Sequence, residues 1–96
     1  KDLCYLITLG EEAKKQGIKL LEELRSNGMP CDTDYEGKSL KGAMRQANDL
    51  QARFVLLIGE DELKKGVITL KDMRSSTQEE IAAQDLTRVL KERLKC

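Results

Sequence analysis

The sequence predicts an α/β domain in which a five-stranded mixed sheet lies between helices. Three observations support this fold class. Up to residue 59, short apolar runs alternate with segments of helical periodicity, which is typical of parallel strands joined by right-handed crossovers. Residues 67–82 contain two consecutive strand patterns, so a hairpin adds one antiparallel strand. A chain of 96 residues that is 40% hydrophobic suits one domain with its own core.

The chain is predicted to begin with a strand, a helix and a second strand. Residues 3–9 are mostly apolar and long enough for a strand buried on both faces. A helix follows over residues 11–27, where apolar side chains recur at helical spacing. Gly28 can adopt the left-handed conformation that ends such a helix. Since a proline soon blocks further helix, residues 29–34 are predicted to form a short edge strand.

The middle of the chain is predicted to form a helix and a buried strand. Ser39 is a suitable N-cap for a helix over residues 39–51, which carries an apolar stripe at helical spacing. Residues 53–59 form the strongest buried-strand pattern in the sequence. Residues 60–66 are predicted to form a loop that has room for one helical turn.

The last third is predicted to form a hairpin and a helix. Strand patterns at residues 67–73 and 77–82 flank a short polar turn. A final amphipathic helix starts near Gln84. With this order of elements, the first and third strands are predicted to be central in the sheet.

The cysteines and the absence of histidine exclude several kinds of site. Cys4, Cys31 and Cys96 are widely spaced, so the sequence has no CxxC pair for zinc or thiol redox chemistry. Without histidine there is no Ser–His or Cys–His catalytic pair. We expect reduced thiols in a cytoplasmic protein, with Cys4 and Cys31 as small core residues.

The apolar runs and the first residues of the chain indicate whether it has a membrane span, a signal peptide or a longer parent protein. The longest apolar run, residues 54–58, is too short to span a membrane, so no membrane partner is expected. No signal-peptide pattern opens the chain. Because Lys1 leads almost directly into a strand, we expect residues 1–96 to be one domain taken from a longer protein.

The net charge of zero hides a regional separation of charge. Residues 38–53 hold four basic residues against one acidic residue, whereas residues 1–36 hold five basic against eight acidic. Lys41 and Arg45 are four positions apart and share one side of the second predicted helix. Such a face is usually only solvated, but it also suits phosphate contacts. Tyr35, beside it, either stacks on an unpaired base or covers the edge of the sheet.

Three consecutive acids follow the strongest strand. Ligands of open α/β sheets gather at the carboxyl ends of strands, where Glu60, Asp61 and Glu62 are placed. The acids form either a solvated loop or a polar recognition element that accepts hydrogen bonds from base edges. No metal is expected, because a metal site would need ligands from elsewhere and only Asp34 is a candidate. Glycine patterns of nucleotide-binding turns are absent after the first strand.

Two stretches carry a resemblance to a known family. They are ARFVLLIGEDELKKGVITLKDM, residues 52–73, and DYEGKSLKGAMRQANDLQ, residues 34–51. Both resemble the C-terminal anticodon-binding domain of class IIa aminoacyl-tRNA synthetases, and IGEDEL and the hairpin point to the histidine-specific members. The resemblance covers essentially the whole chain. It implies a three-layer α/β/α sandwich that recognises the anticodon loop of histidine tRNA. It also implies a separate catalytic domain that uses ATP and Mg, with no cofactor and no catalysis in this domain.

The resemblance also implies site residues. By similarity to the threonine-specific relatives, the contacts fall at Gly37, Arg45, Glu62 and Lys71. Arg45 would hold a phosphate or a base edge, Glu62 would accept from a base edge, and Lys71 would contact a base or a phosphate. Gly37 departs from the polar residue of that pattern. The predicted nucleic-acid-binding set is completed by residues chosen from charge clustering and exposure, namely Tyr35, Lys38 and Lys41.

One alternative function stays open at this stage. Domains of this kind also occur in synthetase paralogues and stress-sensing kinases, where they regulate another domain or bind a protein. The resemblance implies a homodimeric parent and leaves the isolated domain free to be a monomer.

Overall fold

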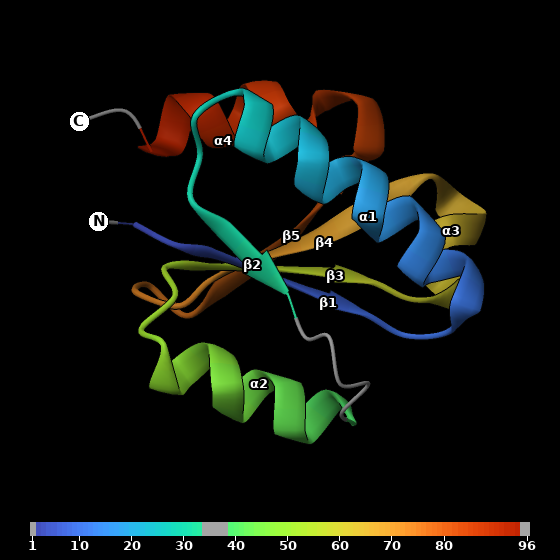
Figure 1. Cartoon of the computed structure of the whole chain (residues 1–96). Coiled ribbons are helices and arrows are strands. Elements are labelled where there is room, and N and C mark those ends of the chain that lie inside the picture. Colours follow the sequence, from blue (N-terminus) through green and yellow to red (C-terminus); the bar gives the residue numbers. More distant parts are fainter. Residues whose placement is uncertain (1, 34–38, 95–96) are drawn as a thin grey trace.

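A computed structural model describes residues 2–33 and 39–94 of the chain (Figure 1). Its five-stranded sheet has the order β2-β1-β3-β4-β5. The strands β1, β2 and β3 are parallel, and β4 runs antiparallel to both of its neighbours. The mixed sheet and its one antiparallel strand were predicted, and both are confirmed. The strands are β1 (Cys4–Thr8), β2 (Cys31–Thr33), β3 (Phe54–Ile58), β4 (Val67–Asp72) and β5 (Thr77–Ala82).

The helices cover both faces of this sheet. Helices α1 and α4 lie on one face and α2 lies on the other (Figure 1). A side-chain contact between the Thr87 hydroxyl and the Glu23 carboxylate links α4 to α1. The three-layer α/β/α sandwich is therefore confirmed. The helices are α1 (Glu11–Ser26), α2 (Leu40–Asp49), α3 (Glu60–Lys65), the 3-10 turn η1 (Ala83–Asp85) and α4 (Leu86–Leu94).

Two predicted elements need correction. Residues 60–65 form the helix α3, which is longer than the one helical turn allowed in the predicted loop, because acids occupy its first turn, lysines its last turn, and Gly66 ends it at a φ of 71°. Strand β2 begins at Cys31 rather than at residue 29. The Met29 N–H instead donates to the Leu24 carbonyl and closes the end of α1, and the Met29 side chain is buried in the core.

The core divides into two clusters, one on each face of the sheet. Alternate strand residues point to opposite faces, so Leu6 and Phe54 join the α1 and α4 side, whereas Tyr5 and Val55 join the α2 side. The second cluster is closed by the alanines of α2, which let this helix pack close to β1 and β3. Helix α2 therefore covers the face of the sheet to which Tyr5 and Val55 point, and alternate side chains of β4 point to the same face.

The thiols of Cys4 and Cys31 are buried and reduced, as the sequence predicts. They pair in register on β1 and β2. Burial raises the pKa of Cys4 to about 12 and that of Cys31 to about 11. Since the thiolate is the reactive form, neither cysteine is a nucleophile near neutral pH.

Gly17 on α1 marks the closest approach between this helix and β1. A Cβ at Gly17 would lie 2.5 Å from Thr8 Cγ2 and 3.1 Å from Leu6 Cδ2. The substitution Gly17→Ala gains helix propensity but overpacks this contact, so we expect a net loss of about 1 kcal/mol in the free energy of unfolding, measured by urea denaturation.

The partner substitution tests the cause of that loss. Thr8→Ser removes Cγ2 and keeps the hydroxyl, so Gly17→Ala should cost less in a Thr8→Ser background than in the wild type. A Gly17→Ala variant that is more stable than the wild type would show that the helix and the strand are further apart.

Candidate nucleic-acid interface

Helix α2 presents two exposed cations to solvent. The Ser39 side chain caps the helix by accepting from the Gly42 N–H at 3.2 Å. Ala43 and Ala47 form its buried side. Lys41 and Arg45 lie on the opposite, outward side of the helix and are exposed. Within the described residues, neither forms an ion pair, so both remain available for phosphate.

Strand β4 places Lys71 on the same face of the sheet as α2. Lys71 is directly opposite Val55 of β3, whose side chain belongs to the α2-side cluster. Residues directly opposite in antiparallel strands share a face of the sheet. Met73, two positions further, packs against that cluster together with Met44 of α2. Lys71 therefore lies on the sheet face that α2 covers, and its side chain is half-buried.

Glu62 is held in place by two hydrogen bonds from different elements. Its Oε1 accepts from the Gly59 N–H at 2.9 Å, which caps α3. Its Oε2 accepts from the Thr69 hydroxyl of β4, also at 2.9 Å. A Cβ at Gly59 would lie 3.0 Å from Oε1, so the glycine makes room for the carboxylate.

The ionised form of Glu62 is favoured in this setting. Partial burial raises the pKa of the carboxyl group, but the hydrogen bonds from Thr69 and the backbone, together with the charge of Lys65, lower it further, so that the pKa lies below its usual value. Because Glu62 is only half-buried, its carboxylate is a charged acceptor near the surface of the domain.

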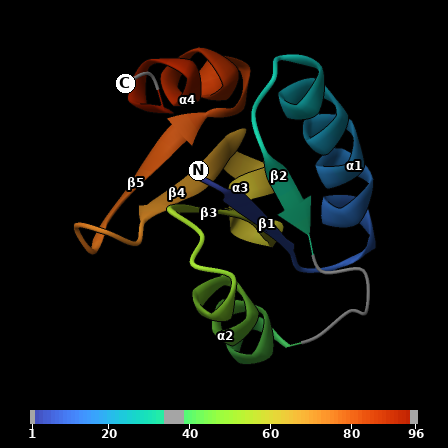
Figure 2. The same cartoon turned by 60° about the vertical axis from the view of Figure 1, so that its left-hand side comes forward.

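Strand β5 continues this face beyond α2. Gln78 is opposite Lys71, and Glu80 is opposite Thr69. Both β5 side chains are exposed, and Glu80 pairs with Lys65 at 3.2 Å. The hairpin of β4 and β5 projects to one side of α2 (Figure 2). We call this region the α2-side surface, and it comprises Lys41, Arg45, Glu62, Lys71, Gln78 and Glu80.

The structure brings some of the predicted site residues together and separates others. Glu62 is linked to the face that carries Lys71, because Thr69, which binds Glu62, is two residues from Lys71 on the same strand. Lys41 and Arg45 share that side of the sheet but stand on the outer side of α2. Tyr35, Gly37 and Lys38 lie outside the described residues.

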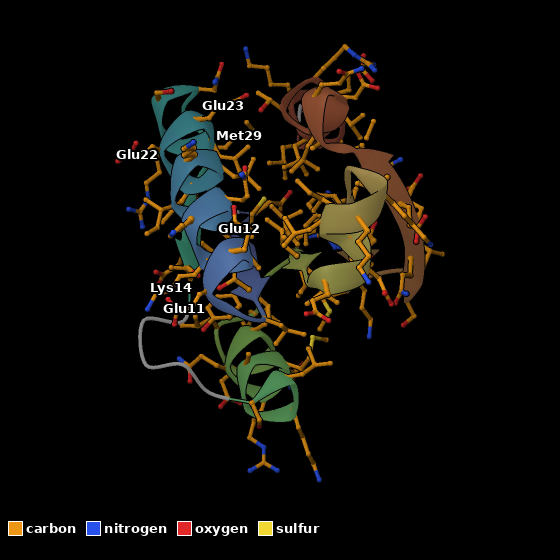
Figure 3. All side chains as sticks on the ribbon, turned by 90° about the vertical axis from the view of Figure 1, so that its right-hand side faces the viewer. Glu11, Glu12, Lys14, Glu22, Glu23 and Met29 are labelled. Atoms are coloured by element: carbon orange, nitrogen blue, oxygen red, sulfur yellow. The ribbon has the colours of Figure 1, made fainter. Side chains whose placement is uncertain are left out.

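One ion-pair network reduces the positive charge that the sequence predicts for residues 38–53. Arg53, one of the basic residues of the 38–53 segment, binds Asp2 at 3.2 Å and approaches Asp72 at 3.8 Å. Its charge is therefore neutralised away from the α2-side surface. On the other face, α1 has glutamates at both of its ends (Figure 3). Its four acidic and four basic residues balance, so α1 offers no excess positive charge to a phosphate backbone.

Two residues that hold Glu62, Gly59 and Thr69, were not predicted as part of this site from the sequence. Glu62 at position N3 of α3 accepts from the N–H of the N-cap Gly59, which is one half of a capping box, since glycine has no side chain to return the second bond. Thr69 gave no signal in the sequence, because its contact with Glu62 depends on how β4 follows α3.

Comparison with known proteins identifies the family of this fold and surface. The family model of the anticodon binding domain matches residues 3–93. The chain belongs to the anticodon-binding domain family. This anticodon-binding domain is 42% identical over 88 residues to the histidine–tRNA ligase of Bacillus velezensis. That match covers 92% of this chain and 21% of the ligase, so the domain spans about a fifth of the length of its curated relative.

Solved structures agree with this assignment. The apo histidyl-tRNA synthetase of S. aureus matches with a TM-score of 0.85 at 38% identity, over 92% of this domain and 25% of that chain. The histidyl-tRNA synthetase of Nostoc matches with a TM-score of 0.88 at 29% identity, over 98% of this domain and 23% of that chain. The anticodon-binding domain therefore corresponds to about a quarter of each of these synthetase chains.

Two further findings concern the described part of the domain. Across residues 2–33 and 39–94, no three His, Cys, Asp or Glu side chains are grouped so that they could hold a metal ion. None of the helices in the same ranges is both long and apolar enough to cross a membrane.

Proposed function

We propose that this anticodon-binding domain recognises the anticodon loop of a histidine-accepting tRNA as part of a longer histidine–tRNA ligase. The observation that carries the proposal is the α2-side surface, where Lys71 and the hydrogen-bonded Glu62 carboxylate lie on the face of the sheet that α2 covers, and Lys41 and Arg45 are exposed on α2. The histidine–tRNA ligase relatives, at 36% to 42% identity, support the histidine specificity. The alternative of a regulatory or protein-interaction domain has no comparable support.

The charged groups of this surface have separate roles. Lys41, Arg45 and Lys71 bind phosphates and set the register of the loop, because phosphate contacts position a nucleic acid without reading its sequence. Glu62 reads a base, since a carboxylate accepts from exocyclic amino groups or ring N–H edges. Tyr35 and Lys38 extend the contact, with Tyr35 stacking on an unpaired base.

The rest of the longer protein supplies the chemistry. Its catalytic domain uses ATP and Mg²⁺ to activate histidine and to join it to the tRNA. The longer protein works as a homodimer in the cytoplasm. The separate recognition domain needs no cofactor for its own task.

The first test is binding of this chain to a histidine tRNA transcript and to a copy with a changed anticodon. We expect tighter binding to the unchanged tRNA, measured by fluorescence anisotropy across a salt series. Lys71→Ala should weaken binding to both tRNAs. If Lys71 contacts a phosphate, the slope of log K against log salt should also become shallower by about 1.

Lys91→Ala provides the matched control. Lys91 is an exposed lysine on α4, on the face of the sheet away from α2. Its loss should leave the affinity and the salt slope near the wild-type values. Equal binding of both tRNAs by the wild-type chain would contradict the proposed function. Equal effects of Lys71→Ala and Lys91→Ala would contradict the assigned surface.

A further inference from the structure

Thr69, which binds Glu62 of the α2-side surface, is a buried polar residue. Among the described residues, it is the one buried side chain that is neither aliphatic, aromatic nor sulfur-containing, and 7% of its surface is exposed. A strand position in a core normally suits a β-branched apolar side chain such as valine. Burying a hydroxyl costs free energy unless the hydroxyl is hydrogen-bonded. The partner that satisfies Thr69 is the Glu62 carboxylate, at 2.9 Å.

The Thr69 hydroxyl completes a two-point clamp on Glu62. The Gly59 N–H binds one carboxylate oxygen and the Thr69 hydroxyl binds the other. The nearest cation along the helix, Lys65, is paired with Glu80 of β5. Both carboxylate oxygens keep a second acceptor position, because each carries two lone pairs and accepts one bond here. The clamp therefore fixes the direction of a side chain that can still bind a further donor.

We propose that Thr69 is a positioning residue for base recognition, whose hydroxyl aims the Glu62 carboxylate at the N–H edge of an anticodon base. This inference rests on the proposed function and adds a residue to it. A free glutamate side chain loses conformational freedom when it binds, whereas a clamped one has already lost it. Thr69 therefore raises the selectivity of Glu62 without itself touching the tRNA.

The test compares Thr69→Val with Thr69→Ser. Valine keeps the shape of the side chain and removes the donor, whereas serine keeps the donor. We expect Thr69→Val to reduce the ratio of affinities for the unchanged and the anticodon-changed tRNA by about three- to tenfold. Thr69→Ser should keep most of the ratio. Carboxyl NMR titration should show a higher Glu62 pKa in Thr69→Val than in the wild type or in Thr69→Ser.

Thr77→Val is the control for the same chemical change. Thr77 is an exposed threonine on β5, and its hydroxyl interacts with Ser75 rather than with Glu62. This variant should leave both the affinity ratio and the Glu62 pKa unchanged. Thermal unfolding of every variant checks that the chain remains folded.

Three results would overturn the inference. The first is a Thr69→Val variant with the wild-type affinity ratio. The second is an equal loss of affinity for both tRNAs, which would mean a general disturbance of the surface. The third is an unchanged Glu62 pKa in Thr69→Val. If the wild-type chain binds both tRNAs equally, the proposed function fails, and the role of Thr69 in base recognition fails with it. The pKa titration still reports separately whether the Thr69 hydroxyl holds the Glu62 carboxylate.

Discussion

Replacing Phe54 with alanine is expected to lower the free energy of unfolding by about 3–5 kcal/mol. Phe54 has no exposed surface and lies on β3, the middle strand of the sheet. It is paired in register with Cys4 on one side and Asp72 on the other, and its ring packs in the α1-side cluster. Truncation removes the buried ring and leaves a cavity between sheet and helices. Urea denaturation followed by circular dichroism measures the loss.

Two comparisons separate cavity formation from other causes. Phe54→Leu keeps an apolar side chain and should lose clearly less stability than Phe54→Ala. Ile18→Ala removes an apolar side chain that is 54% exposed, so it should change stability by less than about 0.5 kcal/mol. Since small domains are stabilised by about 5–15 kcal/mol, Phe54→Ala leaves a marginal fold. A loss below about 1.5 kcal/mol would contradict the position of Phe54 in the core.

The fold was largely predictable because its strands and long helices have strong patterns. The run ending at Ile58 is apolar on both faces, as a strand between α1 and α2 requires. Helix α3 was predicted only as one helical turn within a loop, because six residues are too few for a helical period to show. The start of β2 was misplaced because an apolar residue such as Met29 suits both a strand and the closing position after a helix. Its use in closing α1 depends on a tertiary contact with the core.

The candidate site was only partly predictable, because it depends on register. Lys71 reaches the α2 side only because it pairs with Val55, and a shift of one residue would place it on the other face. The charge count also overstated the basic segment, because Arg53 lies in an ion-pair network with Asp2 and Asp72. Sequence spacing identifies candidate charges, whereas pairing in the fold decides which of them remain free to bind.

Replacing Glu62 with alanine is expected to have the largest effect on base selectivity. The affinity ratio between the unchanged and the anticodon-changed tRNA should fall by about 10- to 100-fold, because one well-placed base contact contributes about 1–3 kcal/mol of discrimination. The affinity for the changed tRNA should move much less. Competition binding of the two tRNAs at one fixed salt concentration measures the ratio.

Asp61→Ala is the matched control for Glu62→Ala. Asp61 is the neighbouring acid on α3, carries the same charge and is exposed. Removing it changes the local field by the same formal charge but breaks no contact with Gly59 or Thr69. Its affinity ratio should therefore stay close to the wild-type value. If both variants reduce the ratio equally, the acidic segment acts through its general charge and Glu62 does not read a base.

Glu62→Gln separates charge from shape and links the site to pH. Because the pKa of Glu62 in the fold lies below its ordinary value of 4.5, the ionised carboxylate stabilises the folded state. This contribution is fully present above the pKa of the unfolded chain and is lost as the pH falls through the lower pKa of the folded chain. The wild type should therefore be more stable than Glu62→Gln at pH 7, and the difference should shrink as the solution is acidified below about 4.5. A difference that does not depend on pH would mean that the shape of the side chain, rather than its charge, stabilises the contact between α3 and β4.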